Sequence, residues 1–471
     1  MFTESRFTLL AGFTVIAGAG PTGLAVARQL QRHGVPFRIV ERSARPFDGS
    51  RGKGLQPRTL EVLDDLGLID RFQESGSDYP ALLVHRPDGA TVEWRMDELH
   101  EPTPEVPYPN LLMVPQWRTS ELLAEGVPIE FGVGVTSLEQ DADGVRVTLD
   151  TGEVVTARYL VGADGGRSTV RQALGVEFLG STHEDERMLI ADVKLSGLDR
   201  AHWHVWPGDP GFRLGLCPLP GGDWWQLTAP PTDTPVAELV AATDPAITIT
   251  EVGWTSQFRA NIRMADRFRV GNVFLAGDAA HVHSPAGGQG LNTGIQDGYN
   301  LGWKIATGNT TILDTYEAER LPVAADVLGI STTLHRRHVA ADPDAMRRDD
   351  PALRQLTLNY RGGPLTAEHR PTPGRVQAGD RAPDAPLTTG HRLFDLMRGA
   401  HPTLLAFGWP DTLPHLPESL PVHHLPAAEK QAWHAYDTQT PTLFLIRPDN
   451  YVGCATHNPQ DVINYLKQIA Q

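Results

Sequence analysis

A glycine-rich motif near the start of the chain has the residue types and spacing of a phosphate-binding turn. The motif, Gly18-Ala19-Gly20-Pro21-Thr22-Gly23, follows an apolar run and precedes a helical pattern. The first glycine permits a tight turn, the second lets the backbone approach a pyrophosphate, and the third lets the helix pack closely on the strand. The helix N-terminus adds partial positive charge. We therefore predict a dinucleotide site lined by Gly18, Gly20, Pro21, Thr22 and Gly23.

A carboxylate follows the next predicted strand, at Glu41 directly after residues 37–40. In this position a carboxylate can accept hydrogen bonds from the ribose hydroxyls of a dinucleotide. Glu41 is therefore predicted to bind the adenosine half of FAD or NAD.

A second cofactor element begins far along the chain at Arg269 and reads RVGNVFLAGDAAHVHSPAGGQGLNTGIQDGYNLGWKIA. Asp278 stands just after the apolar strand 273–276, where it could accept a flavin ribityl hydroxyl. The glycine turn of residues 285–292 offers backbone amides at a helix start, and such amides can stabilise negative charge on a reduced flavin ring. Two elements that hold the sugar chain and the ring system indicate a flavoprotein rather than a plain dehydrogenase.

A third motif, Gly162-Ala163-Asp164-Gly165-Gly166-Arg167-Ser168, follows the apolar strand 159–161. An aspartate backed by glycines and a basic residue can hold a nucleotide, or it can close a sharp turn through its own side chain. Both interpretations of Asp164 are open on the sequence alone.

The composition argues against several other classes of protein. The formal net charge of −16 disfavours an extended nucleic-acid surface. The two cysteines, Cys217 and Cys454, give no disulfide framework, and their scarcity fits the cytoplasm. Residues 13–17 are predicted to be a strand and not a secretion signal, because cleavage there would destroy the glycine motif. No other segment reaches the ~20 apolar residues of a membrane helix, and no histidine spacing predicts a metal site.

The order of predicted strands and helices indicates an α/β protein of several domains. Residues 1–78, 110–180 and 258–345 are predicted to form a discontinuous Rossmann-like FAD-binding domain. Residues 79–109 are strand-like and rich in proline, and residues 181–257 alternate and are rich in aromatic residues. Together they are predicted to form an antiparallel substrate-binding sheet. Residues 346–385 are predicted to be a linker, and residues 386–471 a small α/β domain.

Taken together, these motifs resemble those of the class A, single-component FAD-dependent aromatic hydroxylases, which have the para-hydroxybenzoate hydroxylase fold. The matching text also includes SRGKGLQPRTLEVLDDLGL at 50–68 and VPQWRTSELL at 114–123, and the resemblance covers nearly the whole chain. It is strongest to bacterial members that hydroxylate polyketide-type aromatics and antibiotics. Those members carry a C-terminal thioredoxin-like domain, which here lacks CxxC and contains only Cys454, so a dithiol role is excluded.

The resemblance implies roles for individual residues. Gly18, Gly20 and Gly23 would line the pyrophosphate, Glu41 the ribose, and Asp278 the ribityl chain. Asp164 belongs to the motif that the family uses for FAD and NADPH. His281 is expected to be structural, and no catalytic side chain is assigned because the flavin carries the chemistry. The remaining cofactor-binding residues implied by the resemblance are Arg42, Arg51, Gln116, Pro285, Gly288, Gly290, Leu291 and Asn292, with Pro285 beside the isoalloxazine.

The same resemblance implies a reaction. NADPH or NADH would reduce FAD, and the reduced flavin would add O2 to form a C4a-hydroperoxyflavin that hydroxylates a phenolic ring. The partners would be an aromatic small molecule, O2 and NAD(P)H, and the enzyme would be a monomer or homodimer. The pocket wall is predicted to include Trp203, Phe212 and Trp224.

Alternative functions stay open at this stage. A Baeyer–Villiger or epoxidising monooxygenase would use the same oxygenated flavin. A catalytically silent flavin-binding accessory protein would keep the fold without the reaction. A flavin-dependent halogenase is disfavoured, because the Trp-x-Trp-x-Ile-Pro segment of those enzymes is absent from the sequence.

Overall fold

The nucleotide-binding layer is a six-stranded sheet assembled from distant parts of the chain. The computed structural model describes residues 12–208, 212–284, 287–339, 347–348, 350–410, 413 and 416–470. All strands of this sheet pair in parallel except its antiparallel edge strand β17. The order is β17 (Arg269–Val270), β18 (Val273–Leu275), β11 (Tyr159–Gly162), β1 (Thr14–Ala17), β2 (Phe37–Glu41) and β7 (Ile129–Phe131).

The central strands of this sheet are short apolar runs that are buried along their whole length, as parallel strands covered on both faces require. The helix α1 (Pro21–Arg32) covers one face, and a three-stranded meander packs against β11 and the helix α5 (Thr169–Ala173). The meander consists of β8 (Val135–Gln140), β9 (Val145–Leu149) and β10 (Val154–Ala157). The succession of β1, the glycine turn and α1 is the arrangement that the sequence predicted.

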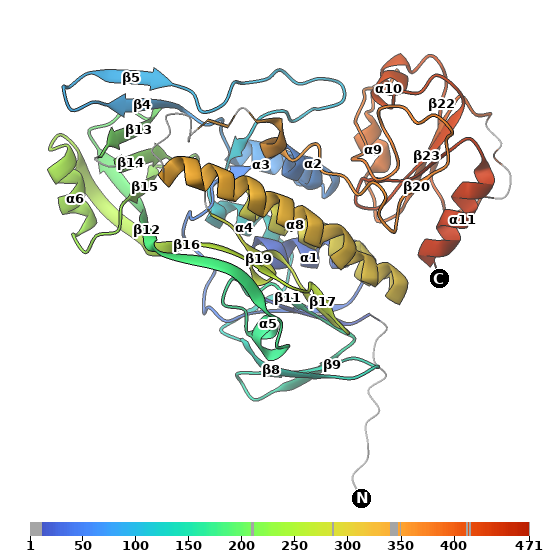
Figure 1. Cartoon of the computed structure of the whole chain (residues 1–471), viewed down its shortest axis with the longest axis horizontal. Coiled ribbons are helices and arrows are strands. Elements are labelled where there is room, and N and C mark those ends of the chain that lie inside the picture. Colours follow the sequence, from blue (N-terminus) through green and yellow to red (C-terminus); the bar gives the residue numbers. More distant parts are fainter. Residues whose placement is uncertain are drawn as a thin grey trace, which may run out of the picture.

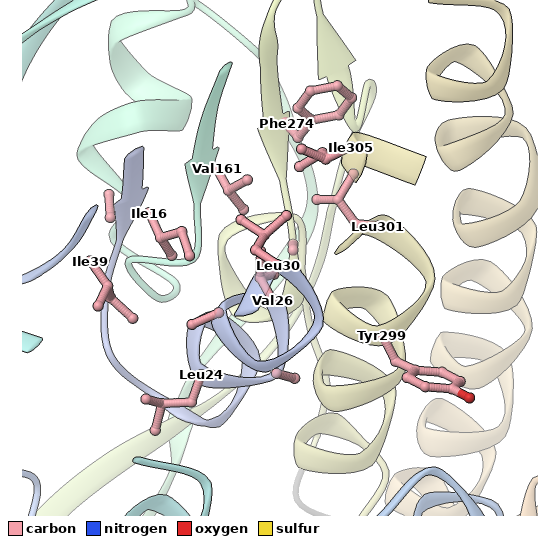
Figure 2. Close-up of a cluster of buried hydrophobic side chains, with 14 of the residues drawn as sticks. Ile16, Leu24, Val26, Leu30, Ile39, Val161, Phe274, Tyr299, Leu301 and Ile305 are labelled. Atoms are coloured by element: carbon pink, nitrogen blue, oxygen red, sulfur yellow. The ribbon is translucent and has the colours of Figure 1, made fainter. Parts of the chain in front are cut away.

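A stripe of glycines lets α7 (Gly290–Thr307) pack unusually close to α1. Gly294, Gly298 and Gly302 recur at a spacing of four residues, so they share one face of the helix. A Cβ atom at Gly298 would lie 2.7 Å from the carbonyl oxygen of Thr22 and 2.9 Å from the Cβ atom of Ala25. Figure 2 shows Val26 and Leu30 of α1 close to Leu301 and Ile305 of α7, in the core that both helices share.

A second, eight-stranded sheet stands beside the nucleotide-binding layer. Its pairs are antiparallel except for the parallel pair of β4 with β13. Two long strands, β12 and β16, run from the nucleotide-binding layer into this sheet, and α6 (Val236–Thr243) covers its outer face (Figure 1). The order is β19 (His281–Val282), β16 (Thr248–Ala265), β12 (Phe178–Ser196), β15 (Trp224–Ala229), β14 (Phe212–Pro218), β13 (His202–Pro207), β4 (Ala81–His85) and β5 (Thr91–Trp94).

The C-terminal part of the chain forms a five-stranded sheet with the arrangement of a thioredoxin-like fold, at the right of Figure 1. Its strands are β20 (Ala367–Glu368), β24 (Val452–Thr456), β23 (Thr442–Ile446), β21 (Thr403–Phe407) and β22 (Val422–Leu425), with helices α9 (Leu393–Met397), α10 (Lys430–Ala435) and α11 (Pro459–Ala470). The segment 350–385 packs against the rest, since Leu353, Tyr360 and Leu365 in it are buried.

The remaining elements connect these layers. The longest is α8 (Thr310–Val339), which crosses the middle of the molecule in Figure 1. Among the described residues, no helix combines the length and apolarity that crossing a membrane requires. The other elements are α2 (Pro57–Asp65), α3 (Ile69–Ser75), α4 (Gln116–Ala124), α5 (Thr169–Ala173), the pair β3 (Gly54–Leu55) and β6 (Leu112–Met113), and the 3₁₀ helices Gly277–Ala279 and Pro351–Arg354.

Buried charges join the C-terminal part to the helices of the nucleotide-binding layer. The guanidinium of Arg447 contacts Glu319 at 2.6 Å and Asp449 at 2.7 Å. Glu319 also accepts a hydrogen bond from Lys304 of α7 at 2.6 Å. Removing one partner of such a group leaves another charge buried without compensation, so these contacts fix how the parts of the chain meet.

The glycine stripe generates a test of the fold. Replacing Gly298 with alanine should lower the free energy of unfolding by about 1–3 kcal/mol, because the new Cβ atom collides with the α1 backbone. The control is Gly329→Ala in α8, where a Cβ atom would meet nothing within 4 Å. That change should raise the free energy of unfolding by about 0.5–1 kcal/mol. Denaturant unfolding measures both, and equal effects would contradict the close approach.

Candidate cofactor and substrate site

The turn between β1 and α1 offers free backbone donors to an anion. Gly18 adopts φ +102° and donates its N–H to the carbonyl of Val40 at 2.8 Å. Pro21 begins the helix, and no side chain caps its N-terminus. The amides of Thr22 and Gly23 therefore have no acceptor within the helix. Beside Gly20 a Cβ atom would meet nothing within 4 Å, so space is open where a diphosphate would approach.

Glu41 is held directly beside this turn. Its carboxylate accepts hydrogen bonds from the N–H of Ala19 and the N–H of Ser43, each at 2.9 Å. These bonds fix the orientation of the carboxylate and leave acceptor capacity on both oxygens. The geometry suits hydrogen bonds from the hydroxyls of a ribose.

Asp278 lies at the end of β18, in the 3₁₀ turn that precedes α7. The residue is exposed to solvent, but many protein atoms lie near its carboxyl group. Desolvation raises the pKa of this carboxyl, and the nearby His281 and Arg51 partly oppose the rise. The Arg51 side chain is exposed and lies 5.8 Å from the ring centre of Trp254. An exposed carboxylate near a guanidinium would suit the hydroxyls of a ribityl chain.

The segment 51–56 runs alongside the first turn of α7. The N–H of Gln56 donates to Asn292 Oδ1 at 2.7 Å, and Asn292 Nδ2 donates to the carbonyl of Gly54 at 2.9 Å. The N–H of Gln116 donates to the carbonyl of Gly52 at 2.9 Å, and the N–H of Gly52 donates to Gln116 Oε1 at 3.0 Å. Gly52 also lies beside Leu291. The structure therefore brings together the predicted residues Gln116, Leu291 and Asn292.

The predicted ring-side turn is described in part. Gly290 begins α7 and Gly288 is exposed, with open space beside it. Pro285 lies outside the described residues. The carbonyl of Gly287 accepts a hydrogen bond from Gln289 Nε2 at 2.9 Å, which closes the turn.

Asp164 and Arg42 meet at the start of α5. Asp164 accepts hydrogen bonds from Ser168 Oγ and from the amides of Thr169 and Val170, at 2.7 Å and 3.2 Å. Arg42 donates to Thr169 Oγ1 at 2.6 Å. Asp164 thus closes its own turn and caps a helix, and that turn lies against Gly18 of the nucleotide loop.

A buried chain of charged and polar groups supports Asp278 and the glycine turn from behind. Asp297 of α7 accepts from the N–H of Gly277 at 3.0 Å, from Arg320 at 2.7 Å, and contacts His281 Nε2 at 2.6 Å. Desolvation alone would raise the pKa of Asp297, but Arg320 and His281 hold it at about 2. The carboxylate is therefore ionised and fixes the backbone that presents Asp278.

The sequence predicted a structural role for His281 but did not identify its partners. His281 Nδ1 lies 2.9 Å from His283 Nε2. Burial, reinforced by His281, lowers the pKa of His283 to about 3, so that ring is neutral. The spacing of His281, Asp297 and Arg320 matches no local motif, and only their meeting in the fold makes them visible.

The inner face of the eight-stranded sheet carries aromatic and polar side chains. The ammonium of Lys53 lies over the ring of Trp203, 4.0 Å from the ring centre. The ring centres of Trp203 and Tyr79 are 6.4 Å apart. Trp224 belongs to the same sheet, and its ring packs on Gly253. The centre of that ring is 4.7 Å from Lys194 Nζ. The side chain of Phe212 lies outside the described residues. Sequence reasoning missed Lys53 and Tyr79, which come from other segments.

The opposite face of β13 carries His202 and His204, which with Asp199 before the strand are possible metal ligands. Their donor atoms all lie within 4.8 Å of one another. In the structure they pair with each other, since His202 Nδ1 lies 2.8 Å from Asp199 Oδ1. His202 and His204 alternate with Trp203 along the strand, so they face away from it.

Comparison with known proteins gives the same picture. A family model described as an FAD binding domain matches residues 13–331, and one described as the C-terminal part of aromatic-ring hydroxylases matches residues 375–470. A flavin-dependent monooxygenase of Mycobacteroides abscessus is 44% identical, over 97% of this chain and 99% of that protein.

Solved structures resemble the whole chain. The anhydrotetracycline hydroxylase of Streptomyces rimosus has a TM-score of 0.73 at 32% identity, covering 97% of each chain. Aklavinone-11 hydroxylase, solved with FAD and aklavinone, has a TM-score of 0.80 at 25% identity, covering 98% of this chain and 99% of that one. The fold is therefore that of FAD-dependent hydroxylases, as the sequence motifs predicted.

The open space beside Gly20 generates a test of the phosphate site. Gly20 has φ −74° and ψ 175°, which alanine also adopts, so Gly20→Ala should leave the melting temperature of the apoprotein unchanged. Its methyl group should weaken FAD binding by about tenfold, or about 1.4 kcal/mol. Gly222→Ala, also in open space but on a turn of the other sheet, is the control. Titration of flavin fluorescence measures both, and unchanged affinity in Gly20→Ala would contradict the placement.

The buried Asp297 generates a second test. Asp297→Asn should lower the free energy of unfolding at pH 7 by about 3–5 kcal/mol, because Arg320 stays buried without a counter-charge. Asp314→Asn removes an ion pair whose carboxylate is 70% exposed and should change it by less than about 1 kcal/mol.

The effect of Asp297→Asn should also depend on pH. The folded-state pKa of about 2 lies below the ordinary 3.8, so the carboxylate stabilises the fold fully above pH 4. That contribution is lost as the pH falls toward 2. Unfolding curves at pH 7, 5 and 3 should therefore show the gap between wild type and variant narrowing at the lowest pH. A constant gap would mean that the charge of Asp297 is not what stabilises the fold.

Proposed function

This chain belongs to the FAD-dependent aromatic-ring hydroxylases, which are flavin-dependent monooxygenases, and we propose that it hydroxylates a polycyclic phenol of the polyketide or antibiotic type. The observation that carries this proposal is the inner face of the eight-stranded sheet. There Trp203, Tyr79 and Lys53 meet beside the segment that contacts the predicted flavin residues. Relatives of the same fold are named for anhydrotetracycline and aklavinone, both ring systems of this kind.

The residues present fit FAD. The free amides at the start of α1 would hold its diphosphate, Glu41 its adenosine ribose, and Asp278 with Gln116 its ribityl chain. Leu291 and Asn292 would lie against its ring system. When bound, FAD supplies the redox and oxygen-transfer chemistry, with NADPH or NADH as the electron donor.

The polypeptide itself positions the substrate and excludes water. An aromatic wall holds a planar ring by stacking, and a correctly oriented ring reacts far faster than one that diffuses freely. Exclusion of water protects the oxidising equivalents from unproductive loss. The inner sheet face would supply both functions.

We place the enzyme in the cytoplasm, where NADPH and NADH are produced, as a monomer or homodimer. Its cysteines, Cys217 and Cys454, are both buried free thiols, and desolvation raises their pKa values. Such thiols are inert, which agrees with a C-terminal domain that has no dithiol role.

The reaction can be tested directly. Purified protein containing FAD should oxidise NADPH faster when a phenolic polycycle is added, and mass spectrometry should find one ¹⁸O atom in the product formed under ¹⁸O2. The matched reaction in H2¹⁸O with ordinary O2 should give an unlabelled product. Absence of label from O2 would exclude a monooxygenase.

Other outcomes separate the remaining alternatives. A labelled lactone or epoxide in place of a labelled phenol would assign Baeyer–Villiger or epoxidising chemistry. NADPH oxidation that yields only H2O2 would mean that the compound is not the substrate. No NADPH oxidation with any phenolic compound would favour a flavin-binding accessory protein.

A further inference from the structure

Lys53 is a buried cation that lacks a carboxylate partner. The residue is 8% exposed, and its ammonium donates a hydrogen bond to Gln226 Oε1 at 2.6 Å. Within the described part of the chain, no carboxylate oxygen lies within 4.0 Å of Nζ. The ring of Trp203 compensates some of the charge through a cation–π contact at 4.0 Å. Burial of an ammonium without a direct ion pair lowers the free energy of unfolding, and the packing around Lys53 gives no reason for a cation at this position.

The groups that face Lys53 form a row across neighbouring strands. Asp192 of β12 stands opposite Gln226 of β15, and Gln226 stands opposite Cys217 of β14. Trp203 follows on β13, and its indole nitrogen is buried without a hydrogen-bond partner among the described residues. The row thus offers polar contacts to a ligand on an otherwise aromatic wall.

Asp192 is the acid in this row, and it is engaged elsewhere. Its Oδ1 accepts a hydrogen bond from Ser50 Oγ, and Gln226 Nε2 donates to the carbonyl of Ser50. Desolvation, opposed by Ser50 and by the charge of Lys53, raises the pKa of Asp192 to about 6. Asp192 therefore interacts with the ammonium through space, and no ion pair within 4.0 Å joins the two among the described residues.

The backbone of Lys53 belongs to the predicted flavin site. Its carbonyl accepts from the N–H of Val114 at 2.9 Å, and the preceding Gly52 is bonded to Gln116 and lies beside Leu291. The following Gly54 accepts from Asn292. The side chain therefore leaves a backbone that contacts the predicted flavin residues and reaches across to the aromatic wall.

We propose that the ammonium of Lys53 binds an ionised oxygen, a phenolate or enolate, of the aromatic substrate. The inference rests on the proposed function and names the chemistry that its substrate must present. The phenol loses its O–H proton to solvent, and the resulting oxygen supplies the negative charge that Lys53 lacks, through a charge-assisted hydrogen bond. An ionised phenol donates more electron density to its ring, which makes the ring carbon a better nucleophile.

The test uses a dye that reports its own ionisation. Alizarin, 1,2-dihydroxyanthraquinone, changes colour when its 2-hydroxyl ionises, and its 2-methyl ether lacks that hydroxyl. Both are titrated into the FAD-loaded enzyme and into Lys53→Met, Lys53→Arg and the control Lys194→Met. Lys194 also lies over a tryptophan of the same sheet, but it pairs with Glu251 at 2.7 Å and is 36% exposed.

Wild type should bind alizarin as the coloured anion at a pH where the free dye is neutral. Lys53→Met should bind it at least about tenfold more weakly and abolish the shift in its ionisation. Lys53→Arg should retain part of the shift, and Lys194→Met should behave like wild type. The methyl ether should bind wild type and Lys53→Met equally. Equal binding of alizarin to wild type and Lys53→Met would overturn the proposal.

Two further readouts separate the other roles that the lysine could have. If Lys53→Met loses FAD, the cation serves the cofactor, and the proposal fails. If its FAD-loaded form melts lower than that of Lys194→Met, the cation is structural, and the proposal also fails. We expect it to melt at or above wild type, because an unpaired buried charge has been removed. Wild type that binds neither dye would count against the proposed function, and the melting comparison would still decide the role of Lys53.

Discussion

The close contact of α1 with α7 is the constraint on which the cofactor site depends. The nucleotide loop stands at the start of α1, and Asp278 and the glycine turn stand just before α7, so the distance between the two helices sets the distance between the two halves of the site. Glycines on α7 permit that distance, because Gly298 approaches the Thr22 carbonyl where any side chain would collide. Two motifs far apart in sequence thus become one site through a contact that contains no ligand-binding atom.

Buried charges hold the same region in register. Asp297 of α7 binds the amide of Gly277, the guanidinium of Arg320 on α8, and His281. Apolar residues of equal volume would stabilise the core as well, since desolvation offsets much of the attraction within a buried ion pair. The hydrogen bond from the Gly277 amide to Asp297 fixes where the backbone turns after β18, and apolar contacts have no such directionality. The presentation of Asp278 follows from that fixed turn.

The sequence predicted the local backbone arrangement at the two candidate cofactor motifs. At Gly18–Gly23 a strand, a glycine turn and a helix follow one another within a few residues, so their geometry follows from backbone rules. Asp278 likewise lies just after a strand, β18, although α7 begins only at Gly290. The sequence left two roles open for Asp164, nucleotide binding and closure of a turn. The structure shows the turn that Asp164 closes and the helix that it caps. Lys53, Gln226 and Asp192 could not be connected from the sequence, because strand pairing sets Gln226 opposite Asp192 and tertiary packing brings Lys53 to them from a separate segment. Nothing in a single sequence gives the order β12–β15–β14–β13.

The segment 50–56 connects the predicted cofactor site with the eight-stranded sheet. Gly52 and Gly54 attach its backbone to Gln116 and Asn292, while Ser50 and Lys53 direct their side chains to Asp192 and Gln226 of the sheet. A shift of this backbone that altered one set of contacts would displace the other. The position of the Lys53 ammonium is therefore defined relative to the predicted flavin residues and not only relative to the sheet. If the ammonium binds one oxygen of the substrate ring, as proposed, this backbone fixes the distance of that oxygen from the predicted flavin residues.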